Sequence, residues 1–239
     1  MGGLFLGLIG GMIAGGATTV GALPILFKNK YQNPLLKMKL DFFIGLLLTT
    51  TALNNISLSV VISIILGIIF VKSSKLMIDN IFMESIALNP SDKKSVFIIL
   101  LLILKNIPEG MAAGASLSLS HTGLGHSILS AIVIQDLFDG LTAALCFLSL
   151  GLSPLFAFAG AVGTGIVEFF SGIFGGYMGH EIAELLPLII AFAGGAMISS
   201  AIEEVLIKAK DESKKIVSNP HFVSGMIVML ILIIWKELL

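Results

Sequence analysis

The stretch Lys105-Asn106-Ile107-Pro108-Glu109-Gly110 lies in the middle of an apolar run from about Val96 to Leu119. A charge pair and a proline are costly in an apolar segment of this length unless they face something polar. A second apolar run carries Gln135-Asp136-Leu137-Phe138-Asp139-Gly140, and a third carries Glu168. Both six-residue stretches have an amide or a carboxylate second, a carboxylate fifth and a glycine sixth. They predict the walls of one polar site inside a bundle of membrane-spanning helices.

The composition supports a lipid environment. Of the 239 residues, 56% are hydrophobic and 12% are charged, whereas a soluble domain carries about 25% charged residues. The formal net charge of -1 argues against a role in nucleic-acid binding. Cys146 is the only cysteine, which excludes an internal disulfide and a Cys-rich metal site. The sequence therefore predicts an all-α, polytopic integral membrane protein with one domain over residues 1–239.

Eight apolar segments approach the roughly 20 residues needed to cross the hydrocarbon core. The first has no positively charged region before it and is long for a signal peptide, so we expect a retained helix. The second and third segments are separated only at Asn54-Asn55, and a single long kinked helix is the alternative there. In the first segment, glycines recur every four residues from Gly3 to Gly15, which predicts a close-packing helix face. The segments cover residues 3–27, 36–54, 57–78, 95–118, 125–149, 153–178, 184–207 and 220–238.

The orientation follows from lysine, because all 14 basic residues are Lys. Apart from Lys105 and Lys236, they fall in the loops between segments 1 and 2, 3 and 4, and 7 and 8. Basic loops face the cytoplasm. The lysine pattern therefore predicts that both termini are extracytoplasmic.

Two sets of polar residues share helix faces. Lys105 and Asn106 lie four and three residues before Glu109, and Gln135 and Asp136 stand in the same relation to Asp139. Pro108 lacks a backbone donor and leaves the carbonyl of the residue four positions earlier without its usual partner. In transporters, such carbonyls near the midplane can bind cations.

The charges of this set do not balance. Glu109, Asp136, Asp139 and Glu168 against Lys105 leave a formal charge of -3. Protons or a divalent cation must offset this surplus in a dry interior. The alternative is a structural salt-bridge network, although such a network would balance its charges.

Other polar residues allow two interpretations. The pair Glu203-Glu204 near the end of segment 7 fits an inner metal-handling site or a solvated helix end paired with Lys208. Outer residues could gather cations at an entrance or serve as ordinary loop residues; these are His121, His126, His180, Glu181 and Glu184. The His-Glu-x-x-His pattern of a metalloprotease is absent, so we expect no enzyme activity.

These stretches resemble the ZIP (Zrt-/Irt-like) divalent-metal transporters, in particular the bacterial ZupT-like branch. The similarity covers nearly the whole chain. It rests on the two six-residue motifs and on Gly21-Ala22-Leu23-Pro24, Gly165-Ile166-Val167-Glu168, Leu186-Pro187 and Ala191 through Met197.

The resemblance implies uptake of a divalent transition metal into the cytoplasm across the cell membrane, with zinc as the leading substrate and no further cofactor. It also implies eight transmembrane helices, a metal centre between helices 4, 5 and 6, a homodimer, and movement of helices 1 and 4–6 as a block against the others. One metal site would comprise Asn106, Glu109, Asp136, Asp139 and Glu168. The second would comprise position 105, Gln135 and the shared Glu109 and Asp139, and Glu203 and Glu204 would lie toward the inner exit.

The departures from the family pattern lead to further expectations. Lys105 replaces a metal-binding His, and a protonated Lys has no lone pair for a metal. We expect its ammonium to occupy the place of one metal and to leave one exchangeable site. Asp139 replaces Glu, and Phe138 replaces Pro, which predicts a straighter helix 5. A site of carboxylates and amides is harder than the family's usual one, which favours tolerance of Mn²⁺, Fe²⁺ or Cd²⁺ beside Zn²⁺.

Two other functions fit the same residues. Lys105 could have silenced transport, leaving a metal-sensing or structural relative. The negatively charged site could also bind protons in a proton-coupled carrier for another small cation.

Overall fold

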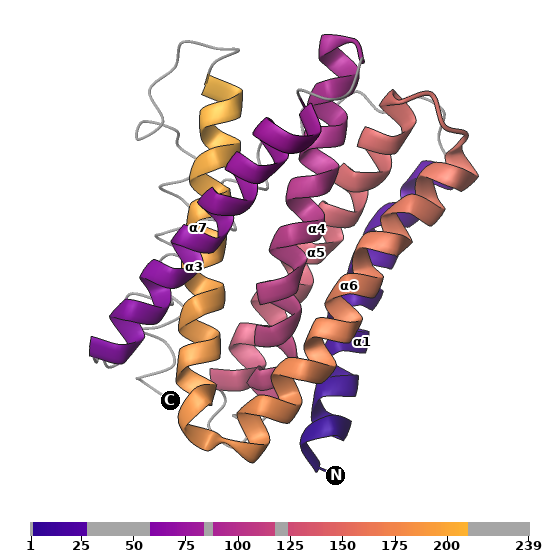
Figure 1. Cartoon of the computed structure of the whole chain (residues 1–239). Coiled ribbons are helices and arrows are strands. Elements are labelled where there is room, and N and C mark those ends of the chain that lie inside the picture. The colour runs from indigo at the N-terminus through magenta and orange to yellow at the C-terminus, as the bar shows by residue number, and fades with distance from the viewer. Residues whose placement is uncertain (1, 28–57, 84–87, 118–123, 210–239) are drawn as a thin grey trace, which may run out of the picture.

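The computed structural model of the chain describes residues 2–27, 58–83, 88–117 and 124–209, and all the regular elements in these ranges are helical. Six of the elements in these ranges are long helices, and they lie side by side in a bundle (Figure 1). The helices are α1 (Gly2–Ala22), α3 (Leu58–Met77), α4 (Pro90–Ser116), α5 (Leu124–Ser149), α6 (Pro154–Glu181) and α7 (Leu186–Ala209). The shorter elements are η1 (Leu23–Leu26), η2 (Ile78–Met83) and η4 (Ala183–Leu185).

Five of the described helices are long and apolar enough to cross a membrane: α1 with η1, α3 with the start of η2, α4, α5 and α6. In α7 the apolar part, Leu186–Ser200, is shorter. Proline stands at the start of α4 and of α6, where its missing N–H costs nothing. The protein is a multi-pass membrane protein, as the composition predicts.

Most of the predicted segments in the described ranges match helices to within a few residues. The exception is the fourth segment, predicted from residue 95, because α4 begins at Pro90 and its first turn carries the polar residues Ser91 and Asp92. Hydropathy alone does not detect a polar helical turn. The segments predicted at 36–54 and 220–238, the Asn54-Asn55 division, and most of the lysine-rich loops lie outside the described residues, so the count of eight helices and the placement of both termini stay predictions.

The six helices form two groups (Figure 1). In one group α1 packs along α6, and α4 and α5 pack against both of them. In the other, α3 packs along α7, and this pair meets the first group mainly where α7 contacts α4. The motif-bearing helices α4, α5 and α6 therefore all belong to the first group.

The α1–α6 contact is made by glycine. A Cβ added at Gly7 would lie 2.7 Å from the carbonyl oxygens of Gly172 and Ile173, and one at Gly11 would lie 2.5 Å from that of Phe169. At Gly15 it would collide with the carbonyl of Gly165. The predicted close-packing face on α1 is confirmed, and it brings the α1 backbone against the turn of α6 that leads to Glu168.

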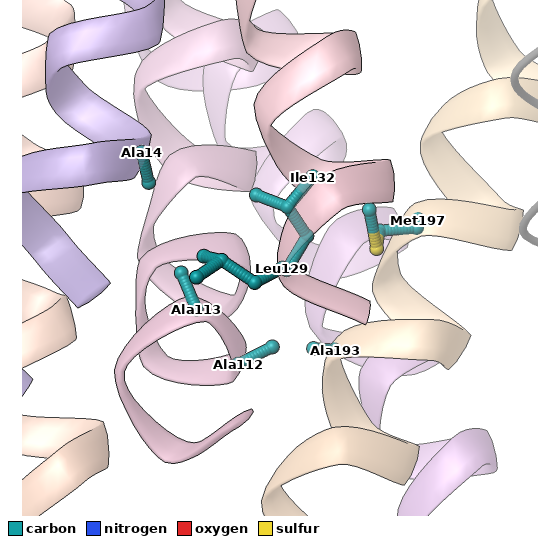
Figure 2. Packing of buried hydrophobic residues seen from close by; sticks show 7 residues of the cluster. All are labelled: Ala14, Ala112, Ala113, Leu129, Ile132, Ala193 and Met197. Atoms are coloured by element: carbon teal, nitrogen blue, oxygen red, sulfur yellow. The ribbon is translucent and has the colours of Figure 1, made fainter. Parts of the chain in front are cut away.

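A buried apolar cluster joins the two groups (Figure 2). It combines side chains from α1, α4, α5 and α7, and these are Ala14, Ala112, Ala113, Leu129, Ile132, Ala193 and Met197. Alanine predominates on α1, α4 and α7, which lets the helices approach closely. On α4, this apolar packing lies about one turn beyond Glu109.

Candidate metal centre

The polar residues of the two motifs and Glu168 are buried. Glu109, Asp136 and Glu168 have no exposed surface, and Asp139 and Lys105 are 2% and 7% exposed. They come from three helices, because α4 carries Lys105 and Glu109, α5 carries both aspartates, and α6 carries Glu168. The predicted polar site between these helices therefore exists as a cluster of side chains in the bundle interior.

Three carboxylates converge at its centre. Glu109, Asp136 and Asp139 each offer an oxygen, and these atoms lie within 4.8 Å of one another. Glu168 is not part of this tight group, but it interacts electrostatically with Asp136. Oxygen ligands at such separations fit a single divalent cation after small side-chain movements.

Lys105 pairs with two of these carboxylates. Its ammonium forms an ion pair with Asp139 Oδ2, and it lies 3.3 Å from Glu109 Oε1. Gln135 donates a hydrogen bond of 2.7 Å from Nε2 to the same Glu109 oxygen. One side of the centre therefore already has donors supplied by the protein.

On the other side of the centre, several oxygens lack such donors. Asn106 donates from Nδ2 to the carbonyl oxygen of Thr164 at 3.1 Å, which leaves its amide oxygen without a partner. Both oxygens of Asp136 and Oε1 of Glu168 are also buried without a hydrogen-bond donor. Each such group costs about 1–3 kcal/mol or more when nothing satisfies it.

These unsatisfied acceptors are confined to the cluster. Among the described residues, every buried carboxylate or amide oxygen without a hydrogen-bond donor belongs to a residue of the two motifs or to Glu168. A network that served only to hold the helices together would pair its acceptors with donors. The arrangement instead has the buried oxygen ligands and the surplus negative charge that a cation site requires.

The chain is similar to two proteins that are named as zinc transporters. The chain is 27% identical over 224 residues to the zinc transporter GufA of Myxococcus xanthus, covering 84% of this chain and 87% of that protein. It is also 27% identical over 134 residues to the zinc transporter ZIPB of Bordetella bronchiseptica, covering 56% of this chain and 43% of that protein. The chain is thus similar to ZIP transporters. No protein-family model matches it.

The chain departs from the pattern expected of a ZIP transporter at positions that the structure describes. Lys105 stands in the centre itself, in contact with two carboxylates. Helix α5 runs without interruption through Phe138, and α4 continues through Pro108. Both relatives are named as transporters and neither as an enzyme.

The remaining predicted residues do not join this centre. Glu203 and Glu204 belong to the last turns of α7, but their side chains are outside the described part of the protein. His126, His180, Glu181 and Glu184 are exposed, and His121 lies outside the described residues. In the described ranges, Glu109, Asp136 and Asp139 are the one group of three or more metal-binding side chains close enough to share an ion.

Sequence reasoning missed the contribution of α1. Thr18 donates a hydrogen bond of 2.7 Å from Oγ1 to Glu168 Oε2, and both residues are fully buried. A signal was present, because Thr18 follows Gly15 by three residues and therefore continues the glycine face.

Proposed function

We propose that this protein carries a divalent transition-metal ion, with Zn²⁺ as the first candidate, across the cell membrane into the cytoplasm. The observation that supports it most is the set of buried, donor-free oxygens of Asn106, Asp136 and Glu168 beside Glu109. Four carboxylates against one ammonium hold a formal charge of -3, which a divalent cation would reduce to -1. The names of both relatives support zinc as the metal.

In this proposal the ammonium of Lys105 takes the place of one metal of a binuclear centre. It already engages Glu109 and Asp139, which are the carboxylates that two metals would share. A lysine ammonium offers donors but no lone pair. The transported ion would then bind at one site formed by Asn106, Glu109, Asp136, Asp139 and Glu168, and Glu109 and Asp139 would also contact the lysine.

The donor set bears on metal preference. Amide and carboxylate oxygens replace the imidazole nitrogen that the family uses, and they suit harder cations. We therefore propose that Mn²⁺, Fe²⁺ and Cd²⁺ are carried beside Zn²⁺. Competition uptake in which Zn²⁺ excludes each of the others by orders of magnitude would contradict this preference.

A second candidate function is that of a metal-sensing or structural relative that does not transport. The contacts of Lys105 favour this function, because an ammonium that pairs with two carboxylates would prevent a metal ion from passing between them. Flux separates the two functions, since a sensor binds the ion without moving it.

The deciding experiment is metal influx into proteoliposomes with native protein, Glu109→Ala and Lys105→His. Inward Zn²⁺ or Mn²⁺ flux that Glu109→Ala abolishes supports the transporter. Absent native flux that Lys105→His restores supports the silenced relative. Metal content of the purified protein adds a second readout, because one ion per native chain and two per Lys105→His chain is the expected result.

A further inference from the structure

The hydrogen bond between Thr18 and Glu168 joins two helices that are far apart in sequence. Thr18 Oγ1 on α1 lies 2.7 Å from Glu168 Oε2 on α6, and 150 residues separate them. Hydrogen bonds to an ionised acceptor are roughly twice as strong as those between neutral groups.

Two glycines on neighbouring helices make room for Thr18. A Cβ at Gly140 of α5 would collide with the carbonyl oxygen of Thr18. A Cβ at Gly165 of α6 would approach the Thr18 Cβ to 3.2 Å. Thr18 therefore packs closely against α5 and α6, at the depth of the carboxylates.

The neighbouring Thr19 shows what a threonine does on this helix when it is not at the centre. Its hydroxyl donates to the carbonyl oxygen of Gly15 within α1, at 3.0 Å, and the residue is only half-buried. Threonine hydroxyls commonly form such bonds within their own helix. Thr18 instead donates across the interface to a carboxylate.

Thr18 leaves Glu168 with two unlike oxygens. Oε2 is held by the hydroxyl, whereas Oε1 is buried and accepts no hydrogen bond. We propose that Thr18 is a positioning residue that makes Glu168 a one-oxygen ligand of the transported cation. This inference rests on the proposed function, because it assumes that a cation binds beside Glu168.

The consequence is a preference for smaller cations. Zn²⁺ binds carboxylate oxygen at about 2.0–2.2 Å with few ligands, whereas larger ions accept both oxygens of one carboxylate at about 2.3–2.6 Å. Without the hydroxyl, Oε2 is released and Glu168 can offer both oxygens. Loss of the hydroxyl thus weakens Zn²⁺ binding and improves the relative binding of a larger cation such as Cd²⁺.

The test uses the full-length protein with Thr18→Val, Thr18→Ser and Thr19→Val. Valine keeps the branched shape but removes the hydroxyl, serine keeps the hydroxyl, and Thr19→Val removes a hydroxyl from the adjacent residue. Zn²⁺ and Cd²⁺ dissociation constants are measured on the purified proteins, and KM and maximal rate are measured in proteoliposomes.

For Thr18→Val we expect Zn²⁺ affinity to fall about 10–100-fold, as for other partners that orient a metal ligand, and the Cd²⁺ to Zn²⁺ affinity ratio to rise. Thr18→Ser and Thr19→Val should stay within about 3-fold of native. The inference is overturned if Thr18→Val binds Zn²⁺ like Thr19→Val, or if Thr18→Ser loses as much affinity as Thr18→Val, since the role is then one of packing. If the native protein neither binds nor carries metal, the proposed function fails first and this inference falls with it.

Discussion

The two sides of the centre differ in whether the protein itself supplies donors and positive charge to the carboxylates. We define the lysine half as Lys105, Glu109, Gln135 and Asp139, and the acceptor half as Asn106, Asp136 and Glu168. In the lysine half, an ammonium and an amide donate to the carboxylates. In the acceptor half, four buried oxygens have no hydrogen-bond donor, whereas in the lysine half Glu109 Oε2 and Gln135 Oε1 lack one but the ammonium is close by.

The carboxylates of both halves are equally buried, but burial has a different consequence depending on whether a donor is present. A buried carboxylate with its partners present is a stable element of the bundle. A buried carboxylate without such partners is held in place by the surrounding packing, and its lone pairs stay free to bind a cation. In the function that we propose, the acceptor half would bind the metal, and the lysine half would balance the charge when no metal is bound. Four substitutions, taken from the largest expected effect to the smallest, test this division.

The largest effect is expected at Asp136, whose two carboxylate oxygens are both unpaired. Asp136→Ala removes the central ligand of the acceptor half. Because losing a residue that only orients a ligand costs 10–100-fold, we expect Zn²⁺ uptake into proteoliposomes to fall by more than about 100-fold. Asp92→Ala serves as the control, since Asp92 lies at the start of α4 beside Asn89 and Ser91. Equal uptake by the two variants would rule out Asp136 as a ligand.

Lys105→Met should alter stability as well as metal binding. It leaves the buried Glu109 and Asp139 without their ammonium, and breaking a buried pair in this way costs about 3–5 kcal/mol. We expect a lower Tm in the presence of a chelator and a larger gain in Tm on adding Zn²⁺ than the native protein shows. Lys94→Met, on the exposed first part of α4, is the control. A Tm equal to that of the control would show that Lys105 does not balance the centre.

Gly15→Ala tests how the acceptor half is held. The added methyl group would meet the carbonyl of Gly165, three residues before Glu168. Overpacking of this kind costs about 1–3 kcal/mol. We therefore expect Gly15→Ala to lower the Tm and to weaken the Zn²⁺ affinity. Gly16→Ala is a matched control, because no atom lies within 4 Å of a Cβ at Gly16. If both variants unfold at the same temperature, the α1–α6 contact is looser than the structure indicates.

The smallest effect is expected at Gln135. Gln135→Met removes one donor to Glu109 Oε1, but Lys105 remains at 3.3 Å from the same oxygen. One hydrogen bond to a charged group contributes about 1.5–3 kcal/mol at most, and the remaining ammonium offsets part of it, so we expect a change in KM of about 10-fold or less. A loss as large as that of Asp136→Ala would place Gln135 among the essential ligands and erase the division between the halves.

Several features were predictable because they depend on residue type and local spacing. Low charge content predicted the membrane, and apolar length predicted the helices. The three- and four-residue spacing placed Lys105, Asn106 and Glu109 on one face of α4, and the four-residue glycine repeat predicted the packing face of α1. The early start of α4 at Pro90 was not predicted, because its first turn is polar and hydropathy responds only to apolar side chains.

The sequence by itself determined which charges must share the bundle interior, since charge and helical period are properties of the residues alone. It could not determine how those charges divide among partners. Only the tertiary structure paired Lys105 with Asp139 as well as with Glu109, left Asp136 without a donor, and brought Thr18 of α1 to Glu168. Those contacts form only where two helix backbones approach closely. Here, glycine-to-backbone contacts between helices that are far apart in sequence allow that approach.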